Sequence, residues 1–247
     1  KNNPDDPYLR YALAKALGDP ERAAAELEAL ALLDPENSMA RFELAANYLG
    51  QGDVTQATAA LEQAMALSSA SAYTRDAMTY NERALIESGM DPDVAHALTA
   101  LTAGSTQYNE IMDLSNDLLE YGRYYQEIGE YDLAQRIFDS VREFGGQVVA
   151  GSSFSYEQMA GLEVQTNAID MLSQIVEYIQ VPGNATALVQ QTQTIVNAFY
   201  ALGGVIGTLS DFLRNIDPSL LSLLSDLILH NGDLDIQSLL QALGIHL

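Results

Sequence analysis

The chain has 247 residues, 48% of them hydrophobic, and a composition this apolar excludes an intrinsically disordered protein. Its 34 acidic and 11 basic side chains give a formal net charge of -23 at pH 7. This charge repels nucleic acids and anionic lipid headgroups, so we expect neither as a partner. The absence of cysteine excludes disulfides, thiolate metal sites and a cysteine nucleophile.

Helix-start signals recur along the chain. An aspartate before a proline can cap a helix with its carboxylate, while the proline takes the first helical position, where its missing N–H costs nothing. Alternating β-branched runs, which would predict strands, are nearly absent, so the sequence predicts an all-α protein. The signals are Asp19-Pro20, Asp91-Pro92, Asp217-Pro218, a variant capping box of Asp53 with Gln56, and turn glycines Gly18, Gly52, Gly89 and Gly129.

Two units of 34 residues, 3–36 and 37–70, open the chain. A fixed period of this length is typical of stacked helix–turn–helix units, none of which buries its apolar face alone. A less regular third unit covers about 72–104 and turns at Gly89, and a fourth covers about 115–145 and turns at Gly129. The echo between the first two units pairs Leu17-Gly18-Asp19 with Gln51-Gly52-Asp53, Tyr8 with Phe42, Ala23 with Ala57, and Leu27 with Leu61.

Residues 41–67 resemble a tetratricopeptide repeat (TPR), because small and large side chains follow each other in that family's packing pattern. The resemblance extends over residues 3–145, although Arg41 stands where the family usually has tryptophan and the third unit fits poorly. It implies an all-α, right-handed superhelical stack of antiparallel helix pairs, a TPR-like α-solenoid with extra C-terminal helices. A helical-hairpin array of another family is the alternative. The matching residues are Leu44, Ala45, Tyr48, Gly52, Ala57, Leu61 and Ala64, then Leu118, Tyr121, Gly122, Tyr125, Gly129, Tyr131, Ala134, Phe138 and Val141.

The C-terminal part has a different character. The glycine- and serine-rich residues 145–155 predict a loop, which divides the chain into repeats at 1–145 and a helical region at 146–247 that packs on or caps the stack. No charged side chain stands between Tyr178 and Ser210. The apolar run at 195–209 is shorter than the ~20 residues of a membrane span, so we expect a buried or interface helix there and no membrane span. Residues 217–247 predict two short amphipathic helices.

Known catalytic and metal-binding patterns are missing from the sequence. His96, His230 and His246 are too far apart to suggest a shared metal site, and the oxygen-rich loop 231–235 lacks the distal glutamate of a calcium loop. Asn184 begins a triplet of the glycosylation type. We therefore expect no catalytic residues, no metal, no cofactor and no enzymatic activity. An enzyme or carbohydrate-binding protein whose carboxylates meet only on folding is the alternative.

By resemblance, the first helix of each TPR pair lines a concave groove that binds a partner. The basic clamp with which co-chaperones of this family hold a peptide carboxylate is missing, since Ala46 and Leu49 stand where polar or basic groups are needed. We therefore expect a protein–protein interaction scaffold that binds an apolar or aromatic helix or peptide. The expected partner-binding residues are Phe42, Leu49, Leu119, Arg123, Tyr124 and Gln126, with Tyr124 foremost because it falls off the packing pattern.

A second hypothesis is a structural subunit that assembles with itself or within a cell-surface or envelope complex. The uncharged stretch 178–210 motivates it, because such a stretch is unusual in so acidic a chain. The chain begins at Lys1 and not at methionine, which suggests a removed leader or a longer protein. We expect an extracytoplasmic location (periplasmic, envelope or secreted), with the cytoplasm as the alternative.

Overall fold

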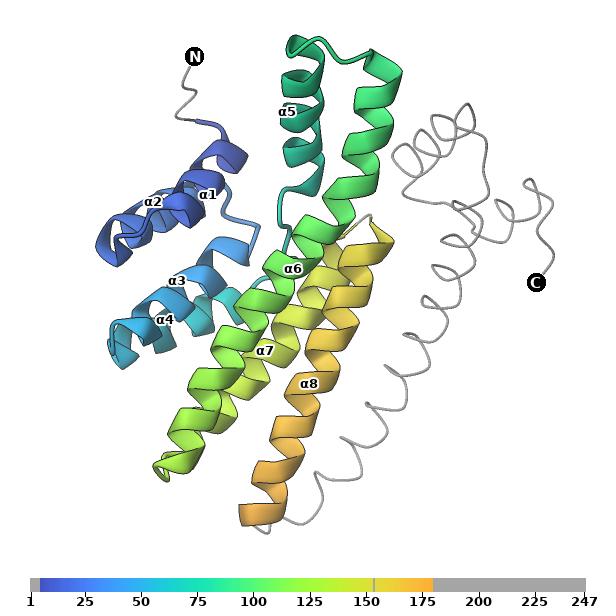
Figure 1. The fold of residues 1–247 in the computed structure, drawn as a ribbon. Coiled ribbons are helices and arrows are strands. Elements are labelled where there is room, and N and C mark those ends of the chain that lie inside the picture. The colour runs from blue at the N-terminus through green and yellow to red at the C-terminus, as the bar shows by residue number, and fades with distance from the viewer. Residues whose placement is uncertain (1–4, 153, 180–247) are drawn as a thin grey trace, which may run out of the picture.

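The computed structural model describes residues 5–152 and 154–179, and within them the protein is built only from helices. The prediction of an all-α protein is thus confirmed. In Figure 1 the first four helices form two short antiparallel hairpins on one side of the molecule, and three long helices lie side by side on the other. The helices are α1 (Pro7–Ala16), α2 (Pro20–Leu33), α3 (Met39–Gly50), α4 (Val54–Met65), α5 (Thr74–Glu87), α6 (Pro92–Glu127), α7 (Tyr131–Gly151) and α8 (Ser155–Ile179).

The predicted helix starts at Asp19, Asp53 and Asp91 are confirmed, because each side chain accepts a hydrogen bond from a backbone N–H of the first turn. Asp6 caps α1 in the same way. At Asp53 the amide of Gln56 also donates to the second carboxylate oxygen at 2.8 Å. The Asp217-Pro218 signal lies outside the described residues. Gly52, Gly89 and Gly129 adopt positive φ values of 76°, 98° and 87°, which explains glycine at these three turns.

The predicted loop at 145–155 is wrong, because α7 runs through it to Gly151. The reason is a close approach of two helices. A Cβ atom on Gly145 would lie 2.5 Å from the carbonyl oxygen of Gly161 in α8, and a Cβ on Gly161 would lie 2.6 Å from that of Gly145. These glycines therefore serve helix packing and not a turn. The domain division proposed at residue 145 falls inside α7, and its C-terminal part lies largely outside the described residues.

Helix α6 is 36 residues long and belongs to two hairpins. Its first part pairs with α5, and its second part packs against α7 and α8. In Figure 1 the α5–α6 hairpin projects beyond the other helices. The third and fourth units expected from the sequence therefore share one continuous helix and are not separate pairs. No proline follows Pro92 inside this helix, so the chain has no strong signal to end it before Gly129.

Buried contacts join the short hairpins to the long helices. The ring of Phe42 on α3 lies 4.8 Å from that of Phe144 on α7, and both side chains are fully buried. The Gln147 amide on α7 donates to the carbonyl oxygens of Ala64 at 3.1 Å and Leu67 at 2.8 Å, where α4 ends. These contacts fix the α3–α4 hairpin against α7, and α3 also contacts α6, which positions the surface described next.

Candidate functional site

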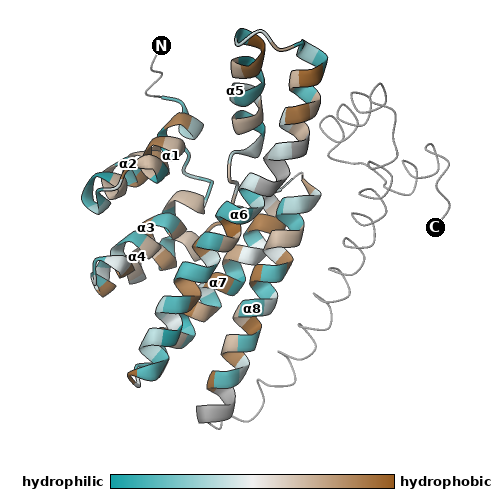
Figure 2. Cartoon of the chain, viewed as in Figure 1, coloured by the Kyte–Doolittle hydropathy of each residue, from teal (hydrophilic) through white to brown (hydrophobic). Residues whose placement is uncertain are grey.

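The second half of α6 presents two different faces. Ile111, Leu114 and Leu118 are buried in the core. A second set of side chains, spaced by three and four residues, forms a stripe on another face of the helix. Its first members are acidic, and its last members, toward the C-terminal end of the helix, are tyrosines. Figure 2 shows hydrophilic residues along much of this part of α6. The stripe consists of Glu110, Asp113, Asp117, Glu120, Tyr121 and Tyr124.

Lys15 on α1 and Glu43 on α3 lie near this stripe. The Lys15 ammonium is 2.7 Å from a carboxylate oxygen of Glu43, and the Tyr11 hydroxyl donates to the same oxygen at 3.2 Å. Burial lowers the pKa of Lys15, but the carboxylates of Glu43, Glu110 and Asp117 raise it by more, so the net pKa lies above its ordinary value. Glu110 and Asp117 are thus close enough to act on this ammonium.

We call the carboxylates that gather here the acidic face. Among the described residues, Glu43 is the only carboxylate of the acidic face that forms an ion pair. Its partner, Lys15, also lies near Glu110 and Asp117. Asp113 and Glu120 act on Asp117 through their charge, so a positively charged group of a partner would relieve the mutual repulsion of these carboxylates. The acidic face comprises Glu43, Glu110, Asp113, Asp117 and Glu120.

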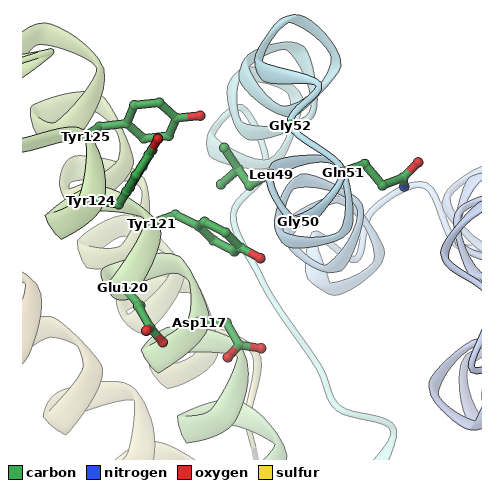
Figure 3. A pocket seen from close by; sticks show the side chains of 9 residues that line it. All are labelled: Leu49, Gly50, Gln51, Gly52, Asp117, Glu120, Tyr121, Tyr124 and Tyr125. Atoms are coloured by element: carbon green, nitrogen blue, oxygen red, sulfur yellow. The ribbon is translucent and has the colours of Figure 1, made fainter. Parts of the chain in front are cut away.

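A cleft of about 770 Å³ opens at one end of the acidic face, between the C-terminal end of α3 and the last turns of α6. Figure 3 shows Leu49 across the cleft from the tyrosines of α6. Tyr124 is 55% exposed, and its ring meets that of Tyr125 edge-on, at 5.2 Å and 74°. The residues that line the cleft are Leu49, Gly50, Gln51, Gly52, Asp117, Glu120, Tyr121, Tyr124 and Tyr125.

Gly50 permits the close approach of Tyr121 to α3. A Cβ at Gly50 would lie 2.9 Å from the Tyr121 hydroxyl oxygen, closer than such atoms normally come. Burial raises the pKa of Tyr121, and the carboxylates of Asp117 and Glu120 raise it further. Both carboxylates therefore act on the tyrosine at the base of the cleft. The carbonyl end of α3 adds the partial negative charge of a helix C-terminus.

The structure separates the six residues that we expected to bind a partner. Phe42 and Leu119 are buried in the core, so the expectation that their side chains line an open groove is wrong: α7 covers Phe42 through Phe144. Leu49 and Tyr124 both line the cleft, but Leu49 is also buried in the core and only Tyr124 is well exposed. Arg123 is exposed on α6, and Gln126 is partly buried; neither lines the cleft.

Sequence reasoning missed the acidic members of this site. The expected groove was apolar, whereas the cleft combines tyrosines with Asp117 and Glu120. A signal for them exists: carboxylates at positions 110, 113, 117 and 120 repeat at i, i+3, i+7 and i+10, a spacing that places them on one helix face. It was obscured because acidic pairs are common throughout so acidic a chain.

Within the described residues, the other candidates for chemistry form no second site. The Nδ1 atom of His96 lies 3.1 Å from a carboxylate oxygen of Glu82. His230, His246, Asn184 and the loop 231–235 lie outside the described residues. Within residues 5–152 and 154–179, no group of three or more metal-ligating side chains converges. In the same ranges, no helix is both long and apolar enough to cross a membrane.

Comparison with known proteins gives no relative: no family model, curated protein or solved structure matches this chain. The resemblance to TPR proteins therefore depends on the packing residues of the sequence quoted above.

The acidic face gives a pH-dependent prediction. Burial raises the pKa of Glu110, Lys15 lowers it, and Glu43 and Asp113 raise it, with a net increase. A raised folded-state pKa means that the folded protein binds the proton more tightly than the unfolded chain does. Stability is therefore lost as pH rises from the ordinary glutamate pKa, about 4.3, through the raised value.

Replacing Glu110 with glutamine should remove this loss. We expect Glu110→Gln to be more stable than the natural protein at pH 7, with the difference shrinking toward pH 4. Thermal unfolding over this pH range measures it. Glu87→Gln, on the exposed side of α5, is the matched control and should not reproduce the effect. A stability difference that does not change with pH would contradict the prediction.

Proposed function

We propose that this protein is a non-enzymatic scaffold of the TPR type that binds a segment of another protein through the acidic face and the cleft at its end. The observation that carries the proposal is the half-exposed Tyr124 in a cleft formed by two separate helical units. Exposed tyrosines on rigid elements are typical of binding hot spots, because they supply large contact area with little loss of conformational entropy.

The burial pattern of the first four helices supports a repeat of the TPR type. Ala23 and Leu27 on α2 are buried, and so are Ala57 and Leu61, which stand 34 residues later on α4. Asn37, between α2 and α3, also bonds to Ser71, which stands 34 residues later between α4 and α5: its side-chain amide donates to the carbonyl of Ser71 at 3.1 Å, and its oxygen accepts from the N–H of Ser71 at 2.9 Å. Corresponding positions thus have corresponding environments in the two hairpins.

The size and support of the cleft suit a peptide. Its volume of about 770 Å³ lies within the ~300–1,000 Å³ range of ligand sites in proteins. Its walls are helical turns anchored in the core, so its shape is largely formed before a partner arrives. We propose that a partner lays an extended or helical segment along α6 and inserts side chains into the cleft.

Substitution of Tyr124 tests the proposal. Immobilised natural protein should retain a partner from extracts of its native source, and Tyr124→Ala should weaken this binding at least about fivefold, as loss of a hot-spot residue does. Leu32→Ala is the matched control, because Leu32 is 84% exposed on α2, and it should bind normally. Equal retention by the Tyr124→Ala and Leu32→Ala variants would count against the cleft.

A second candidate function is a self-assembling structural subunit. It is favoured by exposed apolar side chains at the projecting end of the α5–α6 hairpin, namely Ile86, Val94 and Leu98. Clustered exposed apolar side chains are typical of surfaces that another protein covers. A protein that stays monomeric in sedimentation experiments at increasing concentration would exclude this candidate.

A further inference from the structure

We infer that the cleft binds the guanidinium group of an arginine in the partner segment, held against the tyrosine rings and by the carboxylates of Asp117 and Glu120. This inference rests on the proposed scaffold function and specifies the chemistry of its ligand. It differs from the apolar or aromatic partner expected from the sequence.

Three sources of negative potential converge in the cleft. The first is the carboxylates of Asp117 and Glu120, which lie three residues apart on one face of α6. The second is the faces of the tyrosine rings, which attract cations through their quadrupole. The third is the carbonyl end of α3 at Gly50. The described residues that line the cleft include no basic side chain that would balance these groups.

A guanidinium matches this set better than an ammonium does. It is planar, so it can stack on a ring such as that of Tyr124, and its fork of N–H donors fits a carboxylate with two parallel hydrogen bonds. The Tyr124 ring has an edge-on contact with Tyr125 and lines the same cleft as the two carboxylates. A lysine ammonium offers the charge without the flat surface and the fork.

The acidic face already holds one cation of this chain in a similar way. Lys15 pairs with Glu43, and the Tyr11 hydroxyl donates to the same carboxylate. The described residues that line the cleft include no basic side chain, and other carboxylates act on Asp117 there. Burial raises its pKa, Lys15 lowers it, and Asp113 and Glu120 raise it, with a net increase. A guanidinium at this point would offset the repulsion among the three carboxylates.

Charge complementarity also decides among occupants. A second copy of this chain would bring a net charge of -23 to an acidic surface, and an acidic peptide would be repelled in the same way. A neutral apolar peptide would leave the two carboxylates of the cleft desolvated without a partner, which is unfavourable. An arginine flanked by apolar residues satisfies the carboxylates and also covers part of the exposed ring of Tyr124.

Defined peptides test this inference with the full-length chain. The probe is an acetylated and amidated peptide, Ala-Leu-Arg-Leu-Ala, with versions in which lysine or the neutral isostere citrulline replaces arginine. The ring signals of Tyr121, Tyr124 and Tyr125 report binding by NMR. We expect saturable shifts of these rings with the arginine peptide, with affinity about tenfold weaker for citrulline and intermediate for lysine. The arginine affinity should fall as salt is raised.

Variants of the protein sharpen the test. Combined Asp117→Asn and Glu120→Gln changes should weaken the arginine peptide about fivefold or more and leave the citrulline peptide unchanged. Tyr124→Ala should weaken the arginine peptide about two- to fivefold. Asp170→Asn, an exposed carboxylate on α8, is the matched control and should change neither affinity.

Equal affinity for arginine and citrulline would overturn the inference, because the cleft would then be a site for apolar peptides. Absence of shifts with every peptide would overturn it as well. If Tyr124→Ala still abolished retention of the native partner in that case, the scaffold proposal would stand and only the arginine would be wrong. Conversely, charge-dependent peptide binding without any effect of Tyr124→Ala on partner retention would support the guanidinium site and refute the scaffold proposal.

Discussion

Replacing Phe42 with alanine is expected to lower the free energy of unfolding by about 3–5 kcal/mol, the range for removing a buried phenylalanine. Phe42 is fully buried on α3 and its ring lies 4.8 Å from that of Phe144 on α7. Removal of the ring leaves a cavity where the short hairpins meet the long helices. Two rigid units meet there, so the cavity cannot collapse by moving a single side chain.

Urea unfolding measures this loss, with Leu32→Ala as the control. Leu32 is almost completely exposed, and its removal should change stability by less than about 0.5 kcal/mol. The Phe144→Ala variant and the double variant complete a cycle, from which we expect a coupling of about 0.5–1.5 kcal/mol for the ring pair. If the Phe42→Ala variant had normal stability but no longer bound the partner, Phe42 would belong to the binding surface and not to the core.

Alanine at Gly145 should destabilise the protein by about 1–3 kcal/mol, although alanine favours helix over glycine by about 1 kcal/mol. The new methyl group would lie 2.5 Å from the carbonyl oxygen of Gly161 and 2.9 Å from the backbone nitrogen of Gln165. Backbone atoms cannot move aside as a side chain can, so α7 and α8 would have to separate. The loss therefore outweighs the gain in helix propensity.

The neighbouring glycine supplies the control. A Cβ at Gly146 meets no described atom within 4 Å, so Gly146→Ala should stabilise α7 by up to about 1 kcal/mol. Two adjacent, identical substitutions thus have opposite expected signs, and thermal or urea unfolding of both variants distinguishes them. If both stabilise the protein, α7 and α8 do not approach as closely as described.

Several expectations from the sequence stay predictions. They are the extracytoplasmic location, the division of the chain near residue 145, the absence of enzymatic activity, and the roles of Arg123 and Gln126 in binding. The uncharged stretch from Tyr178 to Ser210 and the amphipathic helices expected after it lie outside the described residues, except for the end of α8.

The sequence by itself determined the starts of α2, α4 and α6, because the signals for these starts and for the turn glycines are local. A carboxylate such as that of Asp19 or Asp53 caps the N–H groups of its own next turn, and Gly52 supplies a left-handed conformation without help from distant residues. The 34-residue echo likewise shows which side chains of the first two units are equivalent, since the packing pattern repeats along the chain.

Tertiary structure alone decided which of these side chains are accessible and which glycines break helices. Gly145 looks like a turn residue in the sequence, but α8 lies against it and requires the absence of a side chain. Phe42 and Tyr124 are both aromatic residues on first helices of their units, and only the position of α7 buries the former while the latter stays half exposed. The cleft joins Leu49 to Asp117 and Tyr124, which are distant in sequence, so it exists only once α3 packs against α6.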